Sequence, residues 1–187
     1  MTTAPHTPGQ TIGPFFHVAM PGEGADRVTD AGDAATIVLE GRVLDGEGRA
    51  VTDALVELWQ ADPGGRYPHP DDARSGECDG RFRGFARVAT DGDGRFTASI
   101  VKPGRVAGAR GGEQAPHVAV TVFATGLLHR LVTRMYFPDE PHANGTDEVL
   151  CAIEPARRER LVARPGEGRL RFDIHLQGDE ETPFLDV

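Results

Sequence analysis

Residues 83–100, RGFARVATDGDGRFTASI, decide the expected fold of this chain. Two runs that favour strands, Arg83–Thr90 and Arg95–Ile100, flank the segment Asp91–Gly94, whose sequence is Asp-Gly-Asp-Gly. An Asp-Gly turn between two such runs is a strong short-range sign of a β-hairpin. The stretch therefore predicts an antiparallel pair of strands, in a chain made of short strands and tight turns.

Similar runs extend this pattern along the chain. They lie at Thr36–Leu44, Ala54–Gln60, His117–Ala124, Arg130–Phe137 and Leu170–Gln177. The last of them alternates apolar and polar residues, which is typical of a strand with one buried face. Only Pro155–Ala163, with proline in its first turn, predicts a helix. Short strands separated by turns predict a mainly β chain with long loops, a β-sandwich or a barrel, of which we expect the β-sandwich.

The N-terminal part differs from the rest in composition. Residues 1–35 are rich in Pro, Gly, Ala and Asp, and they predict an extended arm before a single domain at 36–187. The arm contains apolar Ile12, Phe15 and Phe16 in a Gly/Pro frame. Apolar side chains without local strand partners need a surface to cover, so we expect the arm to pack on a partner chain.

Overall composition excludes several classes of protein. The formal net charge of −9 argues against a nucleic-acid surface and against binding to an anionic membrane. No apolar run approaches the ~20 residues that a membrane span requires, and no signal-peptide pattern is present. Two cysteines, Cys78 and Cys151, do not make a disulfide framework, so a cytoplasmic protein is expected. Hydrolase, nucleotide-binding and Cys-x-x-Cys motifs are absent from the sequence.

Two long irregular segments carry the candidate chemistry. Ala61–Arg81 contains Tyr67 after a Gly-Gly-Arg turn, and a phenolate is a hard anionic ligand suited to ferric iron. Pro103–Pro116 leads to His117, at the start of a predicted strand. Each residue also has an ordinary structural interpretation, as a packed loop tyrosine and a hydrogen-bonded strand histidine. From the residues alone, the structural interpretation is favoured for both Tyr67 and His117.

A series of motifs resembles the intradiol ring-cleaving dioxygenases. In chain order they are Thr7–Phe16, Leu58–Asp62, Gly65–Tyr67, Lys102–Gly104, Ala115–His117, Thr133–Phe137 and Arg171–Thr182. They run in order over nearly the whole chain and are specific as a set. The ending, Gln177–Phe184, resembles the α chains of the protocatechuate 3,4-dioxygenase type rather than the β chains.

The resemblance implies how the candidate site differs from a catalytic one. Catalytic members of the family hold iron with two tyrosines and a His-x-His pair, assisted by an arginine. Tyr67 and His117 match two of these positions, and the resemblance implies that they are relics of a metal site. The other positions hold residues of different chemistry: Val106 for tyrosine, Ala119 for histidine and Gln114 for arginine. The resemblance therefore implies no catalytic residue in this chain, and a ferric ion held by a partner β chain.

The resemblance also implies a role for the arm. Thr11, Gly13 and Pro14, together with Thr125 where related chains carry arginine, are expected at the β chain's substrate pocket. The expected assembly is an α–β heteromer of higher order. It would cleave protocatechuate, a small aromatic substrate, with dioxygen to 3-carboxy-cis,cis-muconate in the β-ketoadipate pathway of aromatic catabolism. Two alternatives stay open, a self-sufficient iron enzyme and a non-enzymatic β-sandwich binding or carrier module.

Overall fold

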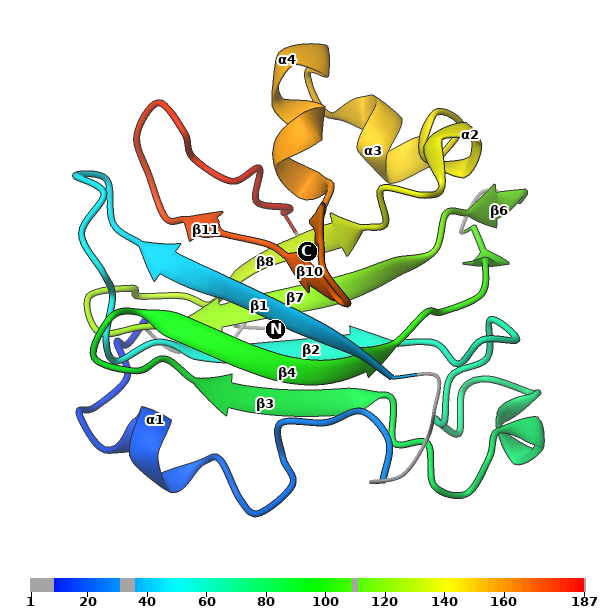
Figure 1. Cartoon of the computed structure of the whole chain (residues 1–187), viewed down its shortest axis with the longest axis horizontal. Helices are drawn as coiled ribbons and strands as arrows, with labels where there is room; N and C mark the ends of the chain where they lie inside the picture. The colour runs from blue at the N-terminus through cyan, green and yellow to red at the C-terminus, as the bar shows by residue number, and fades with distance from the viewer. Residues whose placement is uncertain (1–8, 31–35, 109–110, 187) are drawn as a thin grey trace, which may run out of the picture.

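The computed structural model describes residues 9–30, 36–108 and 111–186, and they form mainly β structure (Figure 1). One sheet has five strands: β1 (Thr36–Leu44), β4 (Arg95–Val101), β9 (Arg164–Gly166), β10 (Arg169–Arg171) and β11 (Ile174–His175). A second has four: β2 (Leu55–Gln60), β3 (Phe85–Ala89), β7 (His117–Phe123) and β8 (Leu131–Tyr136). A separate ladder consists of β5 (Val106–Ala107) and β6 (Glu113–Gln114).

The helices of the described residues are short. They are α1 (Phe16–Ala19), α2 (Pro141–Asn144), α3 (Glu148–Ala152), α4 (Pro155–Arg158) and the 3-10 turns η1 (Ser75–Glu77) and η2 (Glu159–Leu161). The predicted helix Pro155–Ala163 is thus shorter than expected, because α4 tightens into η2 in its last turn. Figure 1 shows α2, α3 and α4 together on one side of the sheets and α1 on the other. Among the described residues, no helix has the length and apolar character to cross a bilayer.

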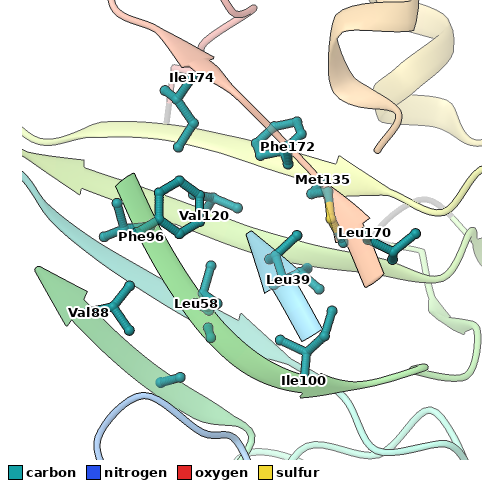
Figure 2. Packing of buried hydrophobic residues seen from close by; sticks show 14 of the residues in the cluster. Leu39, Leu58, Val88, Phe96, Ile100, Val120, Met135, Leu170, Phe172 and Ile174 are labelled. Carbon is teal, nitrogen blue, oxygen red and sulfur yellow. The ribbon is translucent and has the colours of Figure 1, made fainter. Parts of the chain in front are cut away.

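One hydrophobic cluster contains residues from both larger sheets. Leu39 of β1 and Phe96 of β4 belong to it, as do Leu58 of β2 and Val120 of β7, and each is at most 2% exposed. Figure 2 shows these side chains pointing toward one another between the strands. Because side chains alternate along a strand, each strand contributes every second residue to this core. Burial of each such side chain contributes about 1.5–3 kcal/mol to folding.

The strand predictions are largely confirmed. β1 has the predicted bounds, and β2, β3, β4, β7 and β8 begin and end within two residues of them. Leu170–Gln177 is an exception, because it is divided into β10 and β11. At the break, the Asp173 carboxylate accepts a hydrogen bond from the Arg42 amide at 3.0 Å. Because the Asp173 side chain, rather than a backbone carbonyl, accepts this hydrogen bond, the backbone pairing with β1 is interrupted at Asp173.

The predicted hairpin across Asp91–Gly94 is wrong. The turn itself forms, and the Asp91 carboxylate accepts hydrogen bonds from the amides of Asp93 and Arg95 at 2.9 and 2.8 Å. However, β3 pairs with β2, whereas β4 pairs with β1 along seven residue pairs. Val88 and Phe96, on either side of the turn, both belong to the core cluster. Placing the two strands in different sheets lets both apolar faces be buried against each other.

The expected arm is only partly separate from the domain. Val28 is fully buried in the core cluster, and its neighbours Arg27 and Thr29 form backbone bridges to Ser99 and Phe82. Earlier in the arm, Phe15 is 77% exposed. Residues 1–8, including Thr7 of the first motif, and 31–35 lie outside the described residues. The packing of the arm on a partner stays a prediction.

Replacing Gly41 of β1 by alanine should destabilise the fold by at least about 2 kcal/mol, as overpacking of a core does. A Cβ there would lie 1.9 Å from the Phe172 carbonyl oxygen and 2.7 Å from Cζ of Phe96. The measurement is the free energy of unfolding in urea. Gly92→Ala is the matched control, since no atom lies within 4 Å of that Cβ, and it should change stability by less than about 0.5 kcal/mol. Equal effects of the two changes would contradict this account of how β1 meets Phe172.

Candidate functional site

A cleft of about 820 Å³ lies where the two long loops meet the end of β2. Its lining includes Trp59, Tyr67, His69, Arg74, Arg105 and Val106. The first comes from β2, the next three from the first loop, and the last two from the second loop and β5. This volume is within the range of small-molecule sites.

A tight turn carries Tyr67 to the cleft. The Asp62 carboxylate accepts hydrogen bonds from the amides of Gly64 and Arg66 at 2.8 and 3.0 Å, and it pairs with the Arg66 guanidinium. Gly65 has φ of 72°, and a Cβ there would lie 1.9 Å from the Arg105 carbonyl oxygen. Only glycine accommodates both the conformation and the contact. The turn thereby brings the Tyr67 loop against the segment that leads to β5.

Tyr67 is held by stacking. Its ring lies 5.6 Å from that of Trp59, with an angle of 14° between the planes. Its amide donates to the Asp72 carboxylate at 2.8 Å. Burial raises the pKa of the Tyr67 phenol above its usual range, so the side chain is a neutral phenol.

His117 begins β7 and is buried. Its Nδ1 lies 2.8 Å from the Ala115 carbonyl oxygen, which assigns the ring proton to Nδ1 as the donor and leaves a lone pair on Nε2. Burial lowers the pKa of His117 to about 4, and the positive charge of Arg134 acts in the same direction. The imidazole is therefore neutral at pH 7.

The sheet and ladder register bring the remaining predicted positions together around Arg134. Ala119 of β7 pairs with Trp59 on one side and with Arg134 of β8 on the other. The Arg134 guanidinium donates to the Gln114 side-chain oxygen at 2.8 Å, and Gln114 pairs with Val106. The charge of Arg134 also acts on both Tyr67 and His117. All five positions that the resemblance singled out therefore lie in one region.

The side chains of this region do not form a donor set for ferric iron. Val106 and Ala119 are hydrocarbon, so Tyr67 and His117 are the two metal-donor side chains among the five positions, and a ferric ion bound there would take most of its ligands from water. Across the described ranges, no three His, Cys, Asp or Glu side chains are grouped so that they could hold a metal ion.

Sequence reasoning missed two residues of this region. Asp147 is fully buried and accepts hydrogen bonds from the Tyr136 hydroxyl at 2.9 Å, from the Ala115 amide at 2.9 Å and from two amides of α3. An aspartate before an apolar run is a helix N-cap signal, which could have identified it. The sequence around Arg134 gives no comparable signal. Its contacts with Ala119 and Gln114 depend on which residues of neighbouring strands are paired, and a single sequence does not reveal that pairing.

The four candidates for a substrate pocket lie elsewhere. The Thr11 hydroxyl accepts a hydrogen bond from the Gly126 amide at 2.7 Å, which joins the arm to the β7–β8 loop. Gly13, Pro14 and Thr125 are exposed. Thr125 follows the end of β7, whereas His117 begins that strand, so the two lie roughly 25 Å apart by strand geometry. The structure brings Thr11 and the Thr125 loop together and keeps them away from the cleft.

The stability of the chain should depend on pH through His117. Its folded pKa of about 4 lies below the unfolded value of 6.5, so the unfolded chain binds more protons between these values. The contribution of neutral His117 is fully present above about pH 6.5 and falls by up to about 3 kcal/mol as the pH drops toward 4. Urea unfolding from pH 7 to 4 should show this loss in the wild type and a flatter dependence in His117→Gln. His69→Gln, at an exposed position, should keep the wild-type dependence; a flattened one would contradict the assignment.

The two tyrosines should differ in their contribution to stability. Tyr136→Phe removes the hydrogen bond to buried Asp147 and should cost about 1–3 kcal/mol. Tyr67→Phe keeps the stack on Trp59 and should cost less than about 1 kcal/mol. Chemical denaturation of the two variants measures this difference, and a larger loss for Tyr67→Phe would show that its hydroxyl has a role beyond packing.

Comparison with known proteins places this geometry in a family. Residues 13–178 match the family model described as Dioxygenase. The protocatechuate 3,4-dioxygenase alpha chain of Burkholderia cepacia is 41% identical, covering 100% of both chains. That of Pseudomonas putida is also 41% identical, covering 97% of this chain and 96% of the relative. The beta chain from Burkholderia cepacia is 38% identical, over 79% of this chain and 67% of its own.

Solved structures agree in fold. The dioxygenase domain of a dioxygenase carbohydrate-binding protein fusion from Streptomyces sp. SirexAA-E matches with a TM-score of 0.61 and 26% identity, covering 92% of this chain and 98% of that one. Catechol 1,2-dioxygenase from Acinetobacter sp. ADP1 has a TM-score of 0.62 at 22% identity, and the match covers 80% of this chain and 55% of that chain. The chain belongs to the intradiol dioxygenase family, within which it groups with the α chains of protocatechuate 3,4-dioxygenase.

Proposed function

We propose that this chain is the non-catalytic α subunit of a protocatechuate 3,4-dioxygenase. The observation that carries the proposal is its full-length similarity to two α chains, combined with hydrocarbon side chains at two ligand positions. The family depends on ferric iron, which in this proposal is held by a β chain. The assembled enzyme would use dioxygen to open protocatechuate between its hydroxyl-bearing carbons, giving 3-carboxy-cis,cis-muconate. It would work in the cytoplasm as an α–β heteromer of higher order.

In this proposal Tyr67 and His117 are relics of a metal site that now serve structure. The hydrogen bond from His117 Nδ1 to a backbone carbonyl supports this, because metal-binding histidines are commonly oriented in this way. The two sheets would act as a β-sandwich frame for the arm. The partner chain would contact this frame and the arm, and not the cleft.

Exposed apolar side chains at one end of the molecule support a partner surface. Phe15 is 77% exposed, Val18 67% and Met20 38%, all in or beside α1. Leu128, on the β7–β8 loop, is 61% exposed. Large apolar side chains gathered in this way are typical of protein interfaces. Contact with a β chain would bury them.

The same end carries the residues proposed to complete the β chain's pocket. Thr11, Gly13 and Pro14 are exposed on the arm, and Thr125 is exposed on the loop to which Thr11 is bonded. Set against a neighbouring pocket, these residues would form one wall and exclude water. A drier pocket strengthens electrostatic interactions with a bound substrate.

The test is to purify the full chain alone and after co-expression with a β chain of the family. The chain alone should be colourless, poor in iron and unable to consume dioxygen with protocatechuate, whereas the co-purified pair should be coloured and active. Stoichiometric iron and activity in the chain alone would favour the self-sufficient enzyme. Failure to associate with any β chain would favour a binding or carrier module.

The arm can be tested within the active pair. Thr11→Val removes the hydrogen bond to Gly126 and should raise KM for protocatechuate by about threefold to tenfold, with iron content unchanged. Thr97→Val, an exposed position on β4, is the control and should leave KM unchanged. Unchanged steady-state kinetics in Thr11→Val would remove this contact from the pocket.

A further inference from the structure

A small cavity of about 90 Å³ lies between the strands β9 and β10, the turn η2 and the C-terminal segment. Its lining includes three arginines, Arg160, Arg164 and Arg171, together with the buried residue Thr182. This volume holds a few water molecules or one small ion, and it is too small for a drug-sized ligand. The cavity shares no lining residue with the cleft beside Tyr67.

Strand pairing sets two of these arginines directly opposite each other. Arg164 of β9 is the antiparallel partner of Arg171 of β10. Side chains paired in this way share one face of the sheet with Cβ atoms about 5 Å apart, and like charges there are destabilising. Arg171 forms an ion pair with Asp173 at 2.9 Å. The Arg164 guanidinium has neither a hydrogen-bond acceptor nor a carboxylate partner among the described residues.

The same sheet contains another pair of opposed arginines, and these two share a partner. Arg42 of β1 lies opposite Arg95 of β4. The backbone oxygen of Asp93 accepts two hydrogen bonds from the Arg42 guanidinium, and its carboxylate forms an ion pair with Arg95. Within the described ranges, no residue joins the two arginines at the cavity in this way. The cavity lies where such a shared acceptor would be needed.

The three carboxylates of the lining match its arginines in number but not in position. Asp173 is occupied, since it accepts a hydrogen bond from the Arg42 amide at 3.0 Å in addition to its ion pair. Glu180 approaches Arg160 only to 3.9 Å, and its side chain is 72% exposed. Glu159 is exposed and forms no ion pair with any described residue. Because solvent screens exposed charges, the last two carboxylates compensate the arginines weakly.

A buried hydroxyl adds a hydrogen-bond donor to the cavity. Thr182 is 1% exposed, and its hydroxyl oxygen accepts a hydrogen bond from the His175 amide at 3.0 Å. The Thr182 amide in turn donates to the His175 carbonyl oxygen at 3.0 Å, so the C-terminal segment is fixed beside β11. In the part of the chain that the structure describes, the hydroxyl proton of Thr182 has no acceptor. A buried donor of this kind normally has a partner, and an oxyanion in the cavity would supply one.

We propose that this cavity binds a free inorganic oxyanion of the phosphate or sulfate class, held between the guanidinium groups of Arg164 and Arg171 with the Thr182 hydroxyl as a further donor. Guanidinium groups bind such anions through paired, charge-assisted hydrogen bonds. Because the donors come from β9, β10 and the C-terminal segment, the bound anion would fasten that segment to the two strands. The inference goes beyond the proposed function, since it needs neither iron nor a β chain.

Calorimetric titration of the full chain with inorganic phosphate, at constant ionic strength, tests the site. Phosphate and sulfate should each bind saturably, and formate, which has two oxygens and a single charge, should bind at least about tenfold more weakly. Glycerol 3-phosphate distinguishes a free ion from a phosphate ester. It should bind more weakly than phosphate, because its carbon chain does not fit a cavity of this size. Tighter binding of the ester would overturn the assignment to a free ion.

Substitutions of opposite expected effect identify the residues involved. Arg164→Gln should weaken phosphate binding at least about tenfold, because it removes one of the two guanidinium groups, and Arg164→Lys should retain part of the affinity. Glu159→Gln should strengthen binding by about twofold to fivefold, since it removes a negative charge from the lining. Arg95→Gln is the matched control, because Arg95 belongs to the pair that Asp93 joins, and it should bind phosphate as the wild type does.

Circular dichroism establishes that each variant is folded. Arg164 is exposed and its guanidinium is unpaired among the described residues, so its substitution should leave the fold intact; if Arg164→Gln does unfold the chain, the result for Glu159→Gln decides. The proposal would be overturned by non-saturable binding of phosphate, by equal binding of formate, or by wild-type affinity in folded Arg164→Gln. Unchanged or weaker binding in Glu159→Gln, or an equal loss in Arg95→Gln, would overturn it as well.

Discussion

The buried carboxylate of Asp147 is the interaction on which the region around His117 depends. It accepts hydrogen bonds from the Tyr136 hydroxyl at the end of β8, from the Ala115 amide before β7, and from amides at the start of α3. Leaving any of these buried groups unpaired costs about 1–3 kcal/mol, so three distant segments are held in one arrangement. His117 directly follows the segment fixed in this way. The orientation of its ring follows from the position of Ala115.

The region around Arg134 brings together segments that lie far apart in the sequence. The loop that carries Tyr67, the short ladder of Val106 and Gln114, and the start of β7 still meet. Burial keeps both Tyr67 and His117 neutral, and the positive charge of Arg134 favours the deprotonated form of each.

Sequence patterns predicted the strands well because alternation reflects which residues face the core. The family resemblance, rather than these patterns, singled out Tyr67, Val106, Gln114, His117 and Ala119, which the structure places in one region. They failed where the answer depends on pairing between distant segments. The Asp91–Gly94 turn has the chemistry of a hairpin, yet its strands join different sheets, because turn residues fix local geometry and not the choice of neighbour. The hydrogen bond between Arg134 and Gln114 could not be predicted for the same reason, because it depends on the register that sets Arg134 opposite Ala119.

The separation of the two ends of β7 has a consequence for how such a chain can evolve. The strand begins at His117, beside the cleft, and ends next to the loop that binds Thr11. The middle of β7 is fixed in the common core by the buried side chains of Val118, Val120 and Val122. A movement of one end of the strand would therefore also move the other end. Side chains at the two ends can nevertheless be exchanged independently, since roughly 25 Å separates them. Substitutions beside the cleft can therefore accumulate without altering the loop that binds the arm, and the reverse holds as well.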